Sequence, residues 1–259
     1  MKTVWITGAS DGIGKALCEL YASCDWNVIL SSRNEQKLND VKNNLKGAGQ
    51  KFVVSLDLYE HDRIQEVVKQ TIDVVKTVDV LICNGGISQR SLVLETSLQV
   101  EKRVMDIDFF GHTEMTKALL PHFVKNGGGH IAVTSSLVGI IGSPYRSSYA
   151  AAKHALHGYY DSLRAELHDQ KIGVTMVCPG FIKTNVSVNA VTGTGEQLGK
   201  MDDAQANGMS AEKCAKIYKK AIDRKKLEAY IGGKEVMAIY LKRWVPNLFA
   251  KILLKAKVR

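Results

Sequence analysis

The chain has 259 residues, of which 45% are hydrophobic and 24% are charged. A chain of this size can bury a large core within one α/β domain, and four prolines without any low-complexity tract exclude a disordered protein. The formal net charge is +9, but the lysines and arginines are concentrated late in the chain without a nucleic-acid-binding motif, so no nucleic-acid partner is expected.

The cysteines and the apolar runs of the sequence indicate whether the protein binds a metal and in which compartment it lies. Five widely spaced cysteines form no Cys/His cluster suited to zinc: Cys18, Cys24, Cys83, Cys178 and Cys214. We therefore expect reduced thiols and no metal site. The first strand is expected to begin at Thr3, which leaves no room for a signal segment, and no apolar run reaches the roughly 18 to 20 residues that span a bilayer. These features predict a cytoplasmic protein.

A strand, a glycine-rich turn and a helix are predicted at the start of the chain. The apolar run Val4–Ile6 meets glycines at positions 8, 12 and 14, and residues 15–22 have apolar side chains at helical spacing. Glycine lets a backbone approach the phosphates of a dinucleotide, and the amino terminus of the next helix presents N–H groups to them. The pattern indicates dinucleotide binding, and a plain glycine turn is the alternative.

The rest of the chain alternates between predicted strands and helices. Strands are expected at residues 27–31, 51–58, 78–83, 129–136, 174–178 and 229–231, and helices at residues 61–75, 97–126, 149–168 and 210–224. This βα alternation predicts a single doubly wound, Rossmann-like α/β domain with a seven-stranded parallel sheet over residues 1–233.

The candidate chemical residues lie between residues 136 and 153. Tyr149 and Lys153 are at positions i and i+4 of a predicted helix, so the ammonium lies close to the phenol. A nearby cation favours the phenolate, which suits the tyrosine to proton exchange at neutral pH. Ser136 is the last residue of a predicted buried strand that ends in hydroxyls, and its hydroxyl could steady a substrate oxygen. Alone, such a pair often arises by chance, and a solvated helix face is then the favoured interpretation.

Four motifs in order change that interpretation: residues 7–14 (Thr-Gly-Ala-Ser-Asp-Gly-Ile-Gly), Asn84-Gly85-Gly86, Ser136 with Tyr149 and Lys153, and Pro179-Gly180. With them the chain resembles the short-chain dehydrogenase/reductase family from end to end, most closely the branch that reduces steroid, retinoid and other lipid carbonyls. The resemblance implies an oxidoreductase in which Tyr149 gives a proton to the carbonyl oxygen, Lys153 tunes Tyr149, and Ser136 stabilises the oxygen.

The resemblance also implies a set of cofactor-binding residues: Gly8, Ser10, Asp11, Gly12, Ile13, Gly14, Ser32, Arg33, Asp57, Leu58, Asn84, Gly85, Tyr149, Lys153, Pro179, Gly180, Ile182 and Thr184. Asp57 would lie beside the adenine ring, and it could also cap the helix at residues 61–75. Ser32 takes the place of the acid that bonds the ribose 2′-hydroxyl in NAD-dependent members, and Arg33 follows it. A hydroxyl and a guanidinium suit a 2′-phosphate, so the expected cofactor is NADP(H); the alternative for Arg33 is a surface side chain without a ligand.

One position departs from the family pattern. The helix asparagine that holds a water beside the lysine is replaced by Asp108, which can accept a hydrogen bond but adds a charge near Lys153 when ionised. Asp108 therefore joins Ser136, Tyr149 and Lys153 as a candidate catalytic residue. The function predicted is NADPH-dependent reduction of a hydrophobic ketone or aldehyde, or reversible oxidation of a secondary alcohol. The alternative is a catalytically weak, regulatory NADPH-binding protein of the same fold.

The substrate side and the assembly are predicted in less detail. The apolar loop at residues 137–145 favours a hydrophobic substrate, and the polar, glycine-rich segment at residues 185–210 is typical of a mobile lid. The two long helices at residues 97–126 and 149–168 are those through which family members usually form dimers and tetramers. A homodimer or homotetramer is therefore expected.

Residues 234–259 form a basic, amphipathic carboxyl-terminal extension. Twelve large apolar residues alternate there with Lys242, Arg243, Lys251, Lys255 and Lys257, and Pro246 is expected to divide the segment into two short helices. Such a segment suits peripheral contact with an anionic membrane. Packing on the substrate side of the domain or on a second subunit is the alternative.

Overall fold

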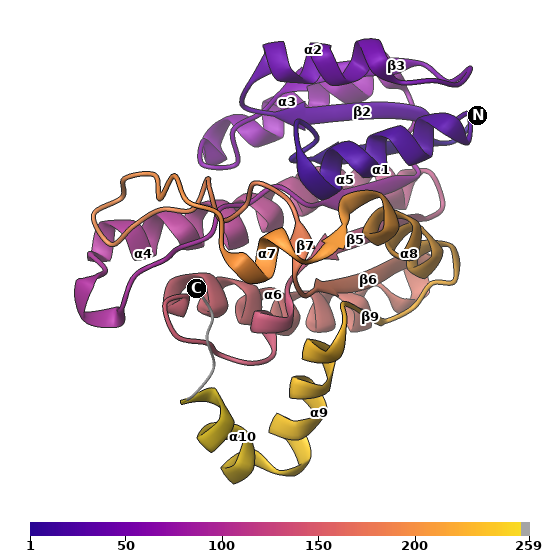
Figure 1. Ribbon diagram of the computed structural model, residues 1–259. Coiled ribbons are helices and arrows are strands. Elements are labelled where there is room, and N and C mark those ends of the chain that lie inside the picture. Colours follow the sequence, from indigo (N-terminus) through magenta and orange to yellow (C-terminus); the bar gives the residue numbers. More distant parts are fainter. Residues whose placement is uncertain (255–259) are drawn as a thin grey trace.

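A computed structural model describes residues 1–254 (Figure 1). Seven strands form one parallel sheet in the order β3-β2-β1-β4-β5-β6-β9. They are β1 (Thr3–Thr7), β2 (Asn27–Ser32), β3 (Lys51–Ser55), β4 (Val80–Cys83), β5 (Gly129–Thr134), β6 (Ile172–Pro179) and β9 (Glu228–Ile231). The order reverses between β1 and β4, where a doubly wound sheet forms its ligand-binding crevice. The predicted seven-stranded Rossmann-like sheet is confirmed.

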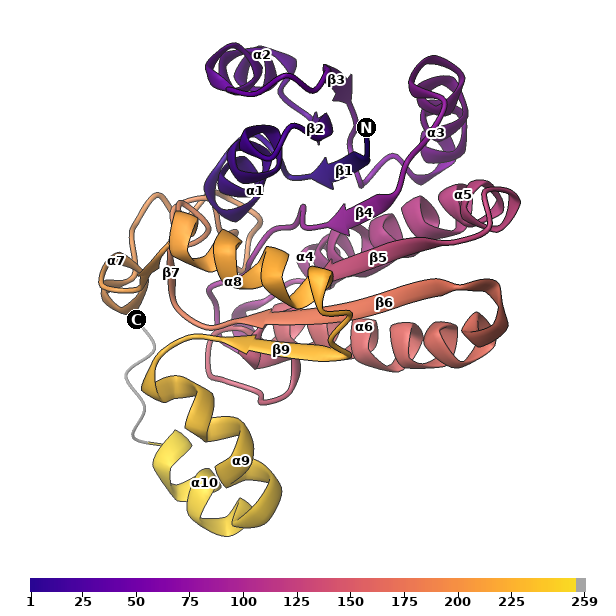
Figure 2. The same ribbon diagram turned by 90° about the vertical axis from the view of Figure 1, so that its right-hand side faces the viewer.

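Helices cover both faces of the sheet (Figure 2). They are α1 (Gly12–Ser23), α2 (Glu35–Asn44), α3 (His61–Val75), α4 (Leu98–Met105), α5 (Gly111–Lys125), α6 (Ser147–Glu166), α7 (Asp203–Ala206), α8 (Ala211–Asp223), α9 (Met237–Trp244) and α10 (Pro246–Leu253). On one face, α1, α2 and α8 pack on side chains such as Val4 and Ile6; on the other, α3, α5 and α6 pack on Trp5 and Leu81. Alternate residues of each strand thus enter two separate cores, as both-sided burial of a parallel sheet requires.

Helix starts follow from side-chain caps. Asp11 caps α1, Ser97 caps α4 and Ser210 caps α8, each by accepting a hydrogen bond from a backbone N–H of the first turn. The predicted cap at Asp57 is wrong: residue Glu60 precedes α3, and the Asp57 carboxylate accepts from the Tyr59 N–H at 3.0 Å instead. Asp57 therefore stabilises the turn before the helix rather than the helix itself.

The long helix expected at residues 97–126 contains a π-helical turn. Between α4 and α5 the segment Asp106–Phe110 is a π-helix, which the apolar spacing did not predict. Such turns occur frequently at functional sites, and this one carries Asp108. The second long helix ends at Glu166 and a 3-10 turn, His168–Gln170, follows it.

The segment predicted as a lid has structure of its own. Its flanks pair as two short strands, β7 (Ile182–Lys183) and β8 (Met209–Ser210), and α7 lies between them. A backbone bridge joins Val191 to Gln89, and the Ser187, Ala190 and Val191 side chains are buried. The segment is thus packed on the body in this structure, and its mobility stays a prediction.

Pro246 divides the carboxyl-terminal extension as predicted, since α9 ends at Trp244 and α10 begins at Pro246. The two short helices form a hairpin that follows β9 and projects from the body (Figures 1 and 2). Among residues 1–254 no helix is both long enough and apolar enough to cross a bilayer. Lys255 and Lys257, which the sequence analysis included in the basic extension, lie outside the described residues.

Candidate active site

A cleft of about 800 Å3 runs along the carboxyl ends of the strands. The glycine turn after β1 forms part of its wall. Gly8 and Gly12 have φ of +65° and +54°, which favours glycine, and a Cβ on Gly12 would lie 2.9 Å from the Thr184 Cγ2. Because the turn ends at the amino terminus of α1, it combines a close backbone approach with free N–H groups. This arrangement fits a dinucleotide pyrophosphate.

Gly14 has a different role from its neighbours. It does not line the cleft, unlike the other glycines predicted to bind a cofactor. A Cβ there would lie 2.1 Å from the Gly8 carbonyl oxygen, so the position requires glycine for packing of α1 against the turn.

Ser32 and Arg33, the residues predicted to bind a 2′-phosphate, line the end of the cleft at β2. Arg33 is exposed and forms no ion pair within residues 1–254, and the Ser32 Oγ lies 3.5 Å from the Asn34 carbonyl oxygen. Lys37, one turn into α2, lines the same end, although the sequence did not single it out. Two cations and a hydroxyl therefore surround this end of the cleft.

Asn84 joins three strand ends beneath the cleft. Its side-chain amide donates to the Thr7 carbonyl oxygen at 3.2 Å, and its oxygen accepts from the Thr134 hydroxyl at 3.2 Å. The Thr7 hydroxyl in turn accepts from the Asn84 and Gly85 N–H groups. Asn84 thereby ties the central strands of the sheet together.

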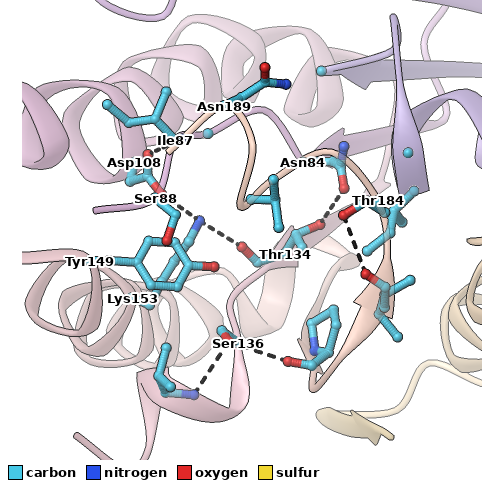
Figure 3. Close-up of a pocket in the computed structure, with 18 of the residues that line it drawn as sticks. Asn84, Ile87, Ser88, Asp108, Thr134, Ser136, Tyr149, Lys153, Thr184 and Asn189 are labelled. Carbon is cyan, nitrogen blue, oxygen red and sulfur yellow. Dashed lines mark hydrogen bonds and ion pairs between the residues drawn. The ribbon is translucent and has the colours of Figure 1, made fainter. Parts of the chain in front are cut away.

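Tyr149 and Lys153 lie together in the cleft wall, one turn apart on α6. The Lys153 Nζ is 5.6 Å from the centroid of the Tyr149 ring, and the Tyr149 hydroxyl points into the pocket (Figure 3). Lys153 is buried and donates from Nζ to the Thr134 carbonyl oxygen at 3.1 Å. The alternative of a solvated helix face is thus wrong, because the pair faces a cleft.

Asp108 contacts the lysine directly. Its Oδ2 lies 3.1 Å from the Lys153 Nζ, and its Oδ1 accepts from the Ile87 N–H at 2.7 Å. Burial raises the pKa of Asp108, an effect that Lys153 and the Ile87 N–H offset only in part. Burial lowers the pKa of Lys153, but the charges of Asp108 and Tyr149 outweigh it, so the pKa lies above its ordinary value. The Asp108 carboxyl group thus lies directly beside Lys153.

We expect Asp108→Asn to keep activity at neutral pH within about tenfold and to move the basic limb of the pH–rate profile to lower pH. The amide still accepts from the Ile87 N–H, but the carboxylate that raises the pKa of Lys153 is gone. The buried ammonium therefore loses its proton at a lower pH. Initial rates measured across the pH range in both proteins test this. Identical pH–rate profiles would show that Asp108 does not affect the protonation of the catalytic residues.

His112 fixes the turn below Asp108. Its Nε2 lies 2.5 Å from the Gly85 carbonyl oxygen, so Nε2 carries the proton and donates it. Burial and the nearby Lys153 lower the pKa of His112 to about 3. A neutral imidazole thus positions the Asn84-Gly85-Gly86 turn without adding charge.

Ser136 lies at the start of the substrate side of the cleft. Its hydroxyl donates to the Pro179 carbonyl oxygen and accepts from the Val138 N–H, both at 3.3 Å. Of the apolar loop that follows, Leu137, Val138 and Ile141 line the cleft. Ser136 and Tyr149 therefore border one space from two different elements (Figure 3).

The other predicted site residues also line this cleft: Ser10, Asp11, Ile13, Asp57, Leu58, Gly85, Pro179, Gly180, Ile182 and Thr184. The sequence missed a buried ion cluster in the same wall. Asp202 Oδ2 lies 2.9 Å from Arg90 Nε and 3.2 Å from Arg146 Nη2. No local signal could have revealed it, because the three residues come from distant segments that only the fold brings together.

Comparison with known proteins is consistent with this geometry. A family model described as short chain dehydrogenase matches residues 2–194. The "Dehydrogenase/reductase SDR family protein 7-like" of Drosophila melanogaster is 40% identical over 100% of this chain and 81% of its own length. A short-chain dehydrogenase structure from Streptomyces avermitilis has a TM-score of 0.82 at 25% identity, covering 97% of this chain and 95% of its own. One from Sphingobium yanoikuyae in complex with NADPH has a TM-score of 0.79 at 23% identity, covering 100% and 97%.

Proposed function

Because this chain belongs to the short-chain dehydrogenase/reductase family, an oxidoreductase family, we propose that it is an NADPH-dependent reductase of a hydrophobic ketone or aldehyde. The observation that carries the proposal is the position of Tyr149, Lys153 and Ser136 at the junction of two unlike halves of one cleft. One half ends at cationic side chains, and the wall of the other includes apolar side chains from several segments.

The residues of the junction have distinct roles in the proposal. Tyr149 donates its phenolic proton to the carbonyl oxygen, and Ser136 donates a hydrogen bond to the same oxygen. Lys153, held by Thr134 and Asp108, keeps a positive charge beside the phenol and favours loss of its proton. Bound NADPH supplies the hydride that adds to the carbonyl carbon, so the product is the alcohol.

The substrate half of the cleft supports the choice of a hydrophobic carbonyl. Its wall includes apolar side chains from four separate segments: Ile87, Val138, Ile141, Val186, Val191, Leu241, Phe249, Ile252 and Leu253. A substrate that covers this wall would gain on the order of 25 cal/mol for each Å2 of apolar surface removed from water. Polar small molecules would gain far less there.

The cofactor preference rests on Ser32, Arg33 and Lys37. We expect NADPH to bind about ten- to a hundredfold more tightly than NADH, because a charge-assisted hydrogen bond to the 2′-phosphate contributes about 1.5 to 3 kcal/mol. Ser32→Asp should reverse the order, since its carboxylate would repel the phosphate and accept from the ribose hydroxyl. Dissociation constants of both cofactors for both proteins test this, and equal constants in the unmodified protein would contradict it.

A regulatory NADPH-binding protein with little turnover remains the competing candidate, favoured by one observation. The Lys153 ammonium already contacts the Asp108 carboxylate and the Thr134 carbonyl. Initial rates of NADPH oxidation with steroid, retinoid, long-chain and quinone carbonyls distinguish the two. Tight NADPH binding with no oxidation by any carbonyl class would favour the regulatory protein.

A further inference from the structure

The α9–α10 hairpin has an inner face that belongs to the catalytic domain. Ile239 is buried against Leu137 and Cys178, and the Lys242 Nζ donates to the Ile140 carbonyl oxygen at 2.5 Å. Phe249 is only 8% exposed and lines the cleft. The hairpin is therefore attached to the loop that follows Ser136, and it forms part of the substrate wall.

The outer face of the hairpin is apolar and exposed. Its exposed large hydrophobic residues are Met237, Tyr240, Trp244, Val245, Leu248, Ile252 and Leu254. Trp244 is 78% and Leu254 is 87% exposed. The hairpin projects from the body of the domain (Figure 2). Single exposed hydrophobic residues are common, but a continuous group marks an interaction surface.

The charge of this face selects the kind of partner. Arg243 and Lys251 are exposed, Lys242 is held on the inner face by the Ile140 carbonyl, and residues 237–254 contain no aspartate or glutamate. Such a surface attracts an anionic partner. In a symmetric dimer through the same face, it would instead bring like charges together.

We propose that the outer face of the α9–α10 hairpin docks on an anionic lipid membrane and that lipid-borne carbonyls enter the cleft beside this hairpin. Aromatic and aliphatic side chains flanked by lysine and arginine are the composition of helices that lie in the headgroup boundary. Each helix has eight residues, so the hairpin lies on the membrane rather than across it.

The route into the cleft follows from Ile252. This side chain is 48% exposed and also lines the cleft, so it stands where the outer face meets the substrate wall. Leu241 and Leu253 continue the apolar wall inward. A lipid tail could therefore leave the bilayer without crossing water. This part of the inference rests on the proposed function, whereas membrane docking does not.

Vesicle flotation of the full-length protein tests docking without any assay of activity. With equal parts of phosphatidylcholine and phosphatidylserine at low salt, binding should exceed that to pure phosphatidylcholine on the order of thirtyfold, because each basic residue near an anionic surface strengthens binding about fivefold and Arg243 and Lys251 act together. Trp244→Asp with Leu248→Asp, and separately Arg243→Glu with Lys251→Glu, should abolish the binding.

Two control variants test whether any change of exposed hydrophobicity or surface charge would alter vesicle binding. Val74→Asp removes a 68% exposed apolar residue from α3, and Lys216→Glu with Lys220→Glu makes the same charge change on exposed positions of α8. Both should float like the unmodified protein. Protein that stays in solution with anionic vesicles would overturn the proposal, and so would hairpin variants that lose self-association in sedimentation instead of vesicle binding.

Substrate entry is tested with two ketones. The Trp244→Asp, Leu248→Asp variant should reduce a vesicle-borne long-chain ketone at least about tenfold more slowly than the unmodified protein, because its effective concentration at the membrane is lost. It should reduce a water-soluble short-chain ketone at an unchanged rate. Equal slowing of both, or of neither, would overturn entry from the membrane. No reduction of any ketone by the unmodified protein would reject the proposed function, while the flotation result would still stand by itself.

Discussion

Tyr149→Phe is expected to lower turnover by about 10²- to 10⁴-fold, the usual contribution of a positioned general acid. Its hydroxyl points into the pocket beside Lys153 (Figure 3), and phenylalanine keeps the ring but has no proton to give. We expect kcat and kcat/KM to fall together, because the lost interaction forms only in the transition state. Steady-state rates with NADPH and a long-chain ketone measure the effect.

Tyr159→Phe is the matched control for this substitution. Tyr159 lies on the same helix, contacts Phe109 and Tyr160 with its ring, and does not line the cleft. It should retain wild-type turnover, and both variants should bind NADPH as the unmodified protein does. Wild-type turnover in the Tyr149→Phe protein would remove Tyr149 from the mechanism.

The sheet and its glycine turn were predictable because the apolar pattern of each segment agrees with the βα order of the whole chain. Apolar strands alternate with helices, and parallel strands bring the residues that follow each of them to one edge. Thr7, Thr134 and Pro179 end three of these strands and Asn84 follows a fourth, so they meet at that edge. The chemistry at that edge was therefore readable from order alone.

Features that depend on distant contacts were not predictable in the same way. The sequence indicated a charge near Lys153, but only the π-helical turn and the loop after β4 fix Asp108 between the Lys153 Nζ and the Ile87 N–H. The apolar spacing of a helix hardly changes over one π turn, so periodicity does not reveal it.

The carboxyl-terminal extension shows a second limit. Its amphipathic pattern left membrane contact and packing on the domain as alternatives. The inner face does pack, through Ile239 and Phe249, while Trp244 stays exposed. A pattern of alternating apolar and basic residues cannot say which apolar side chains the rest of the fold will cover, because that depends on the approach of β9 and of the loop after Ser136.

The buried cluster around Asp202 should have the largest effect on stability. Asp202→Ala removes the carboxylate that Arg90 Nε and Arg146 Nη2 contact at 2.9 and 3.2 Å, and all three side chains are buried. Removing one partner of a buried ion pair typically costs about 3 to 5 kcal/mol. We expect the free energy of unfolding, measured by urea titration, to fall by about this amount.

Asp203→Ala provides the control, because the neighbouring carboxylate is exposed and makes no ion pair within residues 1–254. That variant should lie within about 0.5 kcal/mol of the unmodified protein. The Asp202 cluster joins the segment at residues 185–210 to the loops after β4 and β5, so its loss should also loosen that segment. Faster proteolysis between residues 185 and 210 in Asp202→Ala alone would locate the damage there. An unchanged free energy of unfolding would show that the arginines are held equally well without the carboxylate.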